Sequence, residues 1–241
     1  MARNARDDAP PHALVNALSD EDRINIIAEF KRKSPSKGEI RSGADPASMA
    51  RAYETAGAAA VSVLTEEDYF DGSLDDLRAV RQAISLPVVR KDFIFEEYQV
   101  YESAAAGADA LLLIVAALDD ETLARLRRIT EDELGMDALV EVHTREEMDR
   151  AVKSGAKMIG VNNRNLGTFA VSLETSVRLA PIADSNILLV SESGIESGTD
   201  LRRLYDLGYR GFLIGESLMR ADDPQRVLRN FTQRREDAKE D

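Results

Sequence analysis

Cysteine is missing from this chain of 241 residues, and histidine occurs only twice. Without cysteine, the protein can form no disulfide, offer no thiolate nucleophile and hold no metal through sulfur. His12 and His143 are too few and too far apart in the sequence for a histidine metal cluster. We therefore expect no metal site.

Long apolar runs are missing as well. No run reaches the roughly 18 residues that span a bilayer, and the N-terminal stretch "MARNARDDAPPHALVNALSD" contains no apolar core of a secretion signal. We therefore expect a cytoplasmic protein with no membrane partner. No apolar surface stripe stands out, so we also expect a monomer.

Lysine is scarce: only seven of the 31 basic residues are lysines, while 44 acidic residues give a net charge of −13. An acidic surface that prefers arginine is typical of halophilic adaptation to a salty cytoplasm, and it predicts self-repulsion that salt relieves. The same charge balance argues against a nucleic-acid partner, which requires a basic face.

The chain repeats a pattern of a helix-like stretch, a glycine and an apolar β-run. The four glycines, about 50 residues apart, are Gly57, Gly107, Gly155 and Gly208. A glycine there fits the left-handed position that ends a helix. Between these units lie four more apolar runs: "INIIAEF", "LPVVRKDF", "ALVEVH" and "NILLVSES". The sequence therefore predicts eight strands that alternate with helices.

Alternating strands and helices imply parallel strands with crossover helices. Eight such units in this length favour an α/β fold of the (β/α)8 TIM-barrel type. The alternative, a doubly wound open sheet, usually carries G-x-G-x-x-G after its first strand, where this chain has "KRKSPSKG". We predict a single domain: an N-terminal extension over 1–22 with a short extra helix, the barrel over 23–234, and a charged tail over 235–241. The expected helices span 12–18, 46–56, 74–84, 96–106, 120–133, 144–153, 172–179, 197–207 and 224–234.

Charged residues recur at the predicted C-terminal ends of the strands, where barrels carry their catalytic groups. Residues i and i+2 of a strand share a face, so Glu29 and Lys31 point into the barrel mouth if Ala28 and Phe30 face the helices. The same reasoning brings further polar residues to this end: Lys91, Glu141, His143, Asn162, Arg164 and Glu192. Such a cluster is where pKa values are tuned. A lysine in a dry site beside another lysine is expected to have a lowered pKa.

Two glycine-containing turns predict a phosphate site. Ser193 and Gly194 follow the seventh strand, and Gly215 follows the eighth and precedes a short helical turn. Barrels commonly bind phosphate with these two loops and the N-terminus of that short helix.

Taken together, these residues resemble one family, the indole-3-glycerol phosphate synthases of tryptophan biosynthesis. The matching stretches, in order, are "IIAEFKRKSPSKG", "SVLTEEDYFDGS", "VVRKDFI", "GADALLLIV", "LVEVH", "IGVNNRNL", "SESGI" and "FLIGESLMR". The resemblance implies a carboxy-lyase without metal or cofactor that converts an anionic sugar phosphate, 1-(2-carboxyphenylamino)-1-deoxyribulose 5-phosphate, to indole-3-glycerol phosphate, carbon dioxide and water.

The resemblance also implies roles for the site residues. Lys91 matches the general acid on the ketone oxygen, Lys31 a lysine that contacts the substrate and protonates the leaving hydroxyl, and Glu141 the general base. Which lysine serves which step stays open. The other matching catalytic positions are Glu29, Asn162, Glu192 and Ser193. The matching substrate-binding positions are Phe70 and Phe93 around the ring, Arg164 near the carboxylate or its lid contacts, and Gly194, Gly215 and Glu216 around the phosphate. Ser34 and Leu112 match further substrate-binding positions.

Three positions depart from this pattern or stay unassigned. The N-terminal segment is short, so either a shorter helix covers the site or the site is more open. Glu216 stands where a small residue is often found, and we expect only its backbone N–H to face the phosphate. We expect His143 to be a rim or supporting residue. Two alternative functions remain: an aldolase-type barrel with a Schiff base on Lys91, and a non-catalytic phosphate-binding barrel.

Overall fold

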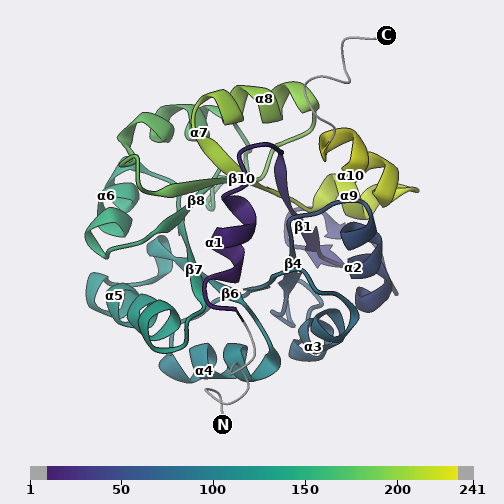
Figure 1. The fold of residues 1–241 in the computed structure, drawn as a ribbon, viewed down its shortest axis with the longest axis horizontal. Helices are drawn as coiled ribbons and strands as arrows, with labels where there is room; N and C mark the ends of the chain where they lie inside the picture. Colours follow the sequence, from purple (N-terminus) through teal and green to yellow (C-terminus); the bar gives the residue numbers. More distant parts are fainter. Residues whose placement is uncertain (1–9, 233–241) are drawn as a thin grey trace.

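The computed structural model describes residues 10–232, and these form a closed barrel of eight parallel strands with helices around it (Figure 1). The strands are β1 (Asn25–Phe30), β4 (Ala60–Leu64), β5 (Val88–Lys91), β6 (Ala110–Ile114), β7 (Asp137–Val142), β8 (Met158–Asn162), β9 (Leu188–Glu192) and β10 (Tyr209–Ile214). Strand β1 pairs with both β4 and β10, which closes the ring. The predicted TIM barrel is therefore confirmed, and the open sheet is wrong.

The helices lie close to their predicted positions. They are α1 (Ala13–Leu18), α2 (Pro46–Thr55), α3 (Leu74–Ala83), α4 (Glu97–Ala106), α5 (Asp120–Arg128), α6 (Arg145–Lys153), α7 (Glu174–Leu179), α8 (Gly198–Asp206), α9 (Glu216–Arg220) and α10 (Pro224–Thr232). Short helical turns add η2 (Val115–Ala117), η3 (Ile129–Glu133) and η4 (Ala180–Ile182). The stretch predicted as one helix over 120–133 changes at Ile129 to π-helical turns, where the backbone N–H of Leu134 bonds to the carbonyl of Ile129.

Both ends of the helices carry residues that stabilise them. Five helices begin after a side chain that accepts a hydrogen bond from the backbone N–H three residues on: Asp45, Ser73, Asp119, Thr144 and Ser197. The four repeated glycines have φ between 84° and 102°, so the predicted left-handed conformation is confirmed. A side chain would strain the backbone at these turns.

The hydrophobic core has two layers, which follow from the alternation along each strand. One layer lies between strands and helices and includes Ile26, Ala28 and Phe30 of β1. The other fills the barrel interior: Ile27, Ala59, Ala60, Val89, Ala110, Leu112, Leu139, Met158, Val190 and Leu213, with Leu14 and Leu18 of α1. Since a strand turns alternate residues to opposite faces, the residues beyond this interior set point into the mouth.

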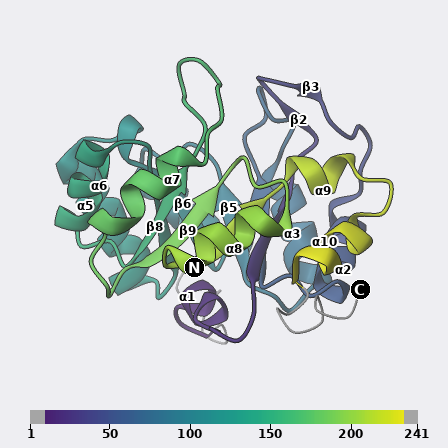
Figure 2. The same ribbon diagram turned by 90° about the horizontal axis from the view of Figure 1, so that it is seen from above.

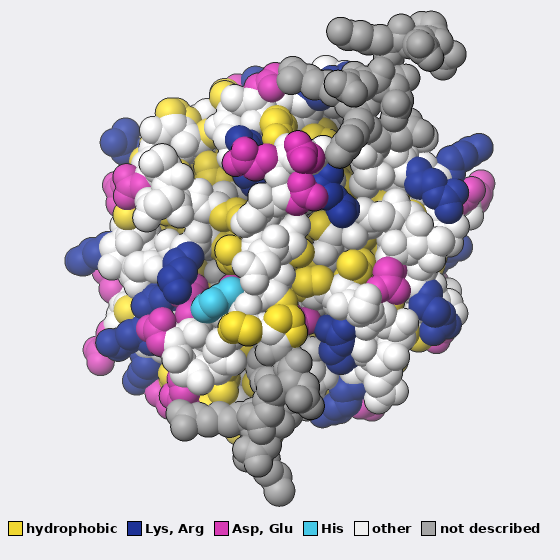
Figure 3. All heavy atoms as spheres, in the orientation of Figure 1, with side chains coloured by type: hydrophobic (Ala, Val, Ile, Leu, Met, Phe, Trp, Pro, Cys, Tyr) yellow, Lys and Arg dark blue, Asp and Glu magenta, His cyan; other side chains and the backbone are white. Residues whose placement is uncertain are grey.

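Helix α1 closes the bottom of the barrel, at the N-terminal ends of the strands. The carboxylate of Asp137, the first residue of β7, accepts from the backbone N–H groups of Leu14 and Val15 and lies 3.0 Å from His12 Nδ1. Acidic and basic side chains are interspersed around the face in whose centre α1 lies (Figures 1 and 3). Of the two alternatives for the short N-terminal segment, a helix that covers the site does not apply to α1, since α1 lies at the end of the barrel opposite the strand C-termini.

The loops that follow the strands rise on the side away from α1 (Figure 2). A two-stranded hairpin, β2 (Lys33–Ser34) with β3 (Gly38–Glu39), follows β1, and a long loop joins β8 to α7. No helix within residues 10–232 is long and apolar enough to cross a membrane. The predicted charged tail over 235–241 lies outside the described residues.

Candidate active site

Charged side chains from four strands, β1, β5, β7 and β9, meet at the C-terminal end of the barrel. Lys91 Nζ lies 3.0 Å from Glu192 Oε2 and 3.5 Å from Glu141 Oε2. Lys31 Nζ donates to Glu29 Oε1 at 2.5 Å. The three carboxylates are at most 2% exposed. Residues up to 163 positions apart in the chain thus form one buried charge cluster, as the sequence predicted from facing alone.

Asn162 ties the base candidate to this cluster. Its Nδ2 donates to Glu141 Oε2 at 3.1 Å, and its Oδ1 accepts from the backbone N–H of Arg164. The side chain therefore fixes one oxygen of Glu141 and leaves the other, Oε1, for a different partner.

Two glycines, each beside the strand that carries the carboxylate, make room for Glu192 and Glu29. A Cβ on Gly160 of β8 would clash with Glu192 Oε1, and a Cβ on Gly215, just after β10, would clash with Glu29 Oε1. A side chain at either position would push a carboxylate out of the cluster. The sequence pattern predicted a phosphate-binding role for Gly215 and no role for Gly160, although a glycine inside an apolar strand is a signal of close approach.

The electrostatics of the cluster correct one expectation. Burial alone would lower the pKa of Lys91, but the carboxylates of Glu192, Glu141 and Glu29 outweigh burial and raise it above its ordinary value. The prediction of a lowered lysine pKa is therefore wrong, because the neighbours that decide it are three anions and not the second lysine.

The carboxylates respond in opposite directions to the same site. Burial raises the pKa of Glu192 to about 7, a rise that Lys91 opposes and that Glu141 and Glu29 reinforce. Burial also acts to raise the pKa of Glu29, but Lys31 and Lys91 overcome it and lower that pKa. Glu192 is therefore the carboxylate of this cluster poised to exchange a proton near neutral pH.

The two predicted phosphate loops lie beside the cluster. Ser193 and Gly194 have φ of 66° and 78°, and Ser193 is one of the few residues other than glycine in this region. Asn163, 2% exposed, holds the turn by donating from Nδ2 to the carbonyls of Glu192 and Ser193. Asn163 was missed by sequence analysis, since the pattern of alternation turns it away from the mouth.

Arg164 lies after the end of β8, where the sequence had placed it inside the strand. It pairs with Val171 across the β8–α7 loop, and its Nη1 donates to Ser36 Oγ at 3.2 Å. Arg164 thus bridges the loops after β8 and β1 above the cluster.

The side chain of Glu216 forms ion pairs close to the predicted phosphate loops. Its carboxylate lies among three cations: Arg220 Nε at 3.2 Å, Lys37 Nζ at 3.7 Å and Arg164 Nη2 at 4.0 Å. A cationic set of this kind attracts any anion, and here it holds the Glu216 carboxylate.

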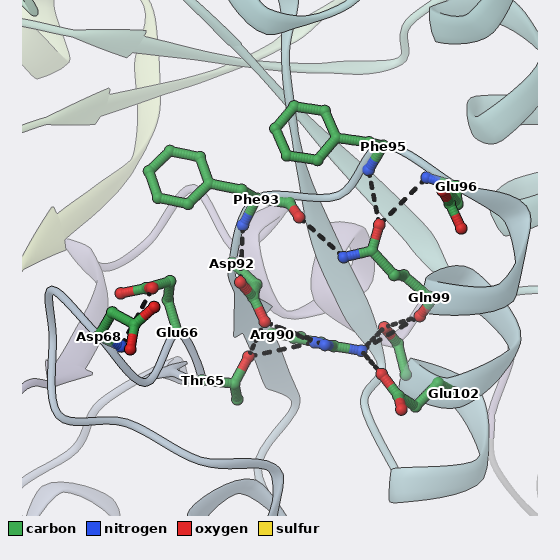
Figure 4. Close-up of polar contacts among 11 residues, drawn as sticks. Thr65, Glu66, Asp68, Arg90, Asp92, Phe93, Phe95, Glu96, Gln99 and Glu102 are labelled. Carbon is green, nitrogen blue, oxygen red and sulfur yellow. Dashed lines mark hydrogen bonds and ion pairs between the residues drawn. The ribbon is translucent and has the colours of Figure 1, made fainter.

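The β5–α4 loop presents two exposed aromatic rings beside the mouth (Figure 4). Phe93 and Phe95 stack with ring centroids 6.4 Å apart. Gln99 holds the loop by accepting from the backbone N–H of Phe95 and donating to the carbonyl of Phe93. The pair offers a flat apolar surface for an aromatic ring; Phe95 was missed by sequence analysis.

Arg90 anchors the same loop from behind. It is 4% exposed, and its guanidinium donates to Asp92, Glu102, Thr65 and the carbonyl of Gln99 (Figure 4). Because Arg90 directly precedes Lys91 in β5, this network fixes the end of the strand that carries the lysine. The alternation along the strand predicted Lys91 as a site residue and gave no role to Arg90, which lies on the opposite face.

The remaining predicted site residues lie at different depths. Phe70 is half-buried after β4, with its backbone N–H held by the Glu66 carboxylate. Ser34 is 7% exposed in the β2–β3 hairpin, and Leu112 is 3% exposed in the barrel interior. Among residues 10–232, no group of three or more histidines, aspartates or glutamates is arranged to hold a metal ion.

Comparison with solved structures supports the fold. The chain superposes on 3-hexulose-6-phosphate synthase from Salmonella typhimurium with a TM-score of 0.68 and 12% identity, covering 86% of this chain and 96% of that one. It superposes on thiamine phosphate pyrophosphorylase from Pyrococcus furiosus with a TM-score of 0.64 and 17% identity, covering 88% and 95%. At these identities the likeness is one of fold.

Comparison of sequences identifies the family. Residues 1–231 match the family model described as indole-3-glycerol phosphate synthase. Proteins of that name from Carboxydothermus hydrogenoformans and Mycolicibacterium gilvum are 50% and 54% identical, over 90% and 91% of this chain and 84% and 80% of theirs. The chain therefore belongs to the indole-3-glycerol phosphate synthase family.

Proposed function

We propose that the protein is the carboxy-lyase that closes the pyrrole ring in tryptophan biosynthesis. Its substrate is 1-(2-carboxyphenylamino)-1-deoxyribulose 5-phosphate, and its products are indole-3-glycerol phosphate, carbon dioxide and water. The family membership supports the reaction. The observation that carries the residue assignments is the buried contact of Lys91 with Glu141 and Glu192 at the barrel mouth.

Lys91 serves as the general acid in this proposal. The aromatic ring carbon attacks the ketone, and the ketone oxygen takes a proton from Lys91 Nζ as the carbon–carbon bond forms. Because the neighbouring carboxylates raise its pKa, Lys91 carries its proton throughout the neutral pH range. A positioned acid of this kind contributes ~10²–10⁴-fold to the rate.

The later steps use the rest of the cluster. The ring carboxylate leaves as carbon dioxide, Lys31 protonates the departing hydroxyl, and Glu141 removes the proton whose loss completes the pyrrole. Asn162 and Glu29 hold these groups, Asn162 by its bond to Glu141 and Glu29 by its bond to Lys31. Glu192, Ser193 and the two lysines thus surround the reacting atoms.

The ends of the substrate bind on either side of the cluster. The backbone N–H groups near Gly194 and Gly215 receive the phosphate, assisted by Lys37 and Arg220 beside Glu216. Arg164 receives the ring carboxylate, and Phe70 and Phe93 flank the ring, with Ser34 and Leu112 completing the contacts. This arrangement lets a strongly acidic protein bind an anion, because the nearby cations act on it more strongly than the distant surface carboxylates, whose charges salt screens.

Incubation with the carboxyphenylamino-deoxyribulose phosphate tests the proposal. We expect indole fluorescence to appear together with carbon dioxide, and borohydride added during turnover to trap no adduct. A covalent adduct on Lys91 would instead establish a Schiff-base barrel, for which the amine must be neutral. Binding without any product would establish a non-catalytic barrel.

We also propose that the protein works as a monomer in the cytoplasm of a salt-adapted cell. The net charge of −13 and the scarcity of lysine support this. The melting temperature should rise between dilute buffer and molar KCl, because salt screens the repulsion between surface carboxylates. Light scattering of the purified chain should give the mass of one copy. A melting temperature that does not rise with salt would overturn the proposed salt adaptation. A dimer mass would overturn the proposed monomer.

A further inference from the structure

His143 lies between a buried carboxylate of the proposed site and a carboxylate near the surface. It follows β7 directly, two residues after Glu141 and on the same face. Its Nε2 lies 3.4 Å from Glu141 Oε1, and its Nδ1 lies 3.1 Å from Glu147 Oε2 on α6. The side chain is 10% exposed. The imidazole is therefore clamped inside the protein and is not a rim residue.

Glu147 fixes the orientation of the ring. Its Oε2 accepts from the backbone N–H of His143 at 2.7 Å as well as facing Nδ1. Since a carboxylate accepts and does not donate, Nδ1 carries the proton in this contact. The other nitrogen is thereby aimed at Glu141.

His143 and Glu141 lie close together but do not form a hydrogen bond in this structure. Nε2 is buried and makes no hydrogen bond within residues 10–232, and at 3.4 Å it is a few tenths of an ångström too far from Glu141 Oε1 for a strong one. The other oxygen of Glu141 already has Asn162 at 3.1 Å and Lys91 at 3.5 Å. Catalytic hydrogen bonds are often long in the free enzyme and tighten when substrate binds.

The charges around the ring favour its protonated form. Glu141 faces it from β7, Glu147 from α6 and Glu192 from β9, while the cations nearest these carboxylates are Lys91 on β5 and Arg150 on α6. Burial acts to lower the pKa of His143, but the three carboxylates outweigh it and raise that pKa above its ordinary value. The doubly protonated ring has a proton for each of its two carboxylate neighbours.

We propose that protonated His143 is a positioning residue for Glu141, donating from Nε2 to Oε1 so that this carboxylate stays ionised and aimed at the substrate. The inference rests on the proposed function, in which Glu141 is the general base. When protonated, His143 donates to Oε1 of Glu141, as Asn162 donates to Oε2. Neutral, with its single proton directed to Glu147, it turns a lone pair toward a carboxylate and repels it.

Two substitutions separate the two ring nitrogens. The amide nitrogen of glutamine lies near the place of Nε2, and that of asparagine near the place of Nδ1. We expect His143→Asn to lower kcat by ~10–100-fold with KM within about twofold, because it removes the donor to Glu141. We expect His143→Gln, which keeps a donor toward Glu141, to lose less than His143→Asn.

The pH profile distinguishes positioning from a merely structural role. In the wild type, kcat should fall as pH rises through the pKa of His143, and this alkaline limb should vanish in both His143 variants. Glu147→Gln removes one of the carboxylates that hold the proton, so the limb should move to lower pH while the plateau rate stays the same. A titration of the two histidines by NMR, with His12→Gln to assign them, measures the same pKa without any turnover.

The outcomes separate the inference from the function it rests on. If the wild type gives no product, the proposed function fails, whatever the histidine does. If the wild type turns over and His143→Asn keeps its rate and its alkaline limb, the positioning role is overturned. An imidazole that titrates below its ordinary pKa in the NMR experiment would overturn it as well, because the ring would then be neutral in the working enzyme.

Discussion

Replacing Lys91 by methionine tests the charged cluster most directly. Methionine fills most of the volume of the lysine stem but carries no proton to donate. The loss of a general acid should lower kcat by at least ~100-fold, which corresponds to about 2.7 kcal/mol of transition-state stabilisation. Because the lysine stem packs at the barrel mouth and not in the interior layer, the fold should persist.

The same substitution should make stability depend on pH. Without Lys91, the three buried carboxylates lose the cation that they share, Glu192 is left without an ion-pair partner, and an unpaired buried charge costs ~3–5 kcal/mol if it stays ionised. Glu192 limits this cost by taking up a proton, since its pKa is already about 7 and rises further without the lysine. A carboxyl group whose pKa is higher in the folded state than in the unfolded state lowers the free energy of unfolding as pH rises between those two pKa values. The variant should therefore be destabilised more at pH 8 than at pH 6.

Indole fluorescence during turnover and thermal melts at the two pH values measure both effects. Lys157→Met is a matched control, because Lys157 also faces a carboxylate, Glu131 at 3.7 Å, but lies outside the cluster and is 57% exposed. It should leave rate and melting temperature nearly unchanged. A Lys91→Met protein that keeps more than a tenth of the wild-type rate, or that melts with the same deficit at both pH values, would refute the reasoning.

Three further perturbations probe other parts of the structure. Glu192→Gln should abolish most activity yet raise the melting temperature at pH 8, with the gain shrinking as pH falls from about 7 toward 4.5, where the wild-type carboxyl is protonated too; an equal gain at pH 5 would contradict this. Leu14→Ala, at a fully buried position of α1, should cost ~2–5 kcal/mol and lower the melting temperature by ~2–4 °C per kcal/mol while leaving kcat intact; a changed kcat would show that the bottom of the barrel communicates with the mouth. Glu216→Gln should lower KM by ~2–5-fold in dilute buffer and less in salt, because its charge no longer competes with the phosphate; an unchanged KM would remove Glu216 from the phosphate surroundings.

Local patterns in the sequence were sufficient for the architecture. The repeated glycines marked where helices end, and period-two alternation showed that Glu29 and Lys31 share a face. Those signals depend only on neighbours in the chain. Eight repeats of one unit then left few ways to pack the strands.

What the sequence missed depends on contacts that barrel closure creates. Lys91 and Glu192 are 101 residues apart, so no local pattern shows that a carboxylate sets the pKa of that lysine. The place of α1 is a similar case, because an amphipathic helix of six residues fits either end of a barrel. Arg164 was placed inside β8 because alternation continues past the residue where strand pairing stops.

The docking of α1 on Asp137 also has a consequence for biosynthesis. His12 and Asp137 are 125 positions apart, so α1 leaves the ribosome well before the fifth strand of the barrel, which carries its carboxylate partner. At translation rates of ~5–20 residues per second, that wait lasts on the order of 6–25 seconds. During it, Leu14 and Leu18 remain exposed to solvent and to chaperones, and the barrel acquires its seal only after most of its wall has been made.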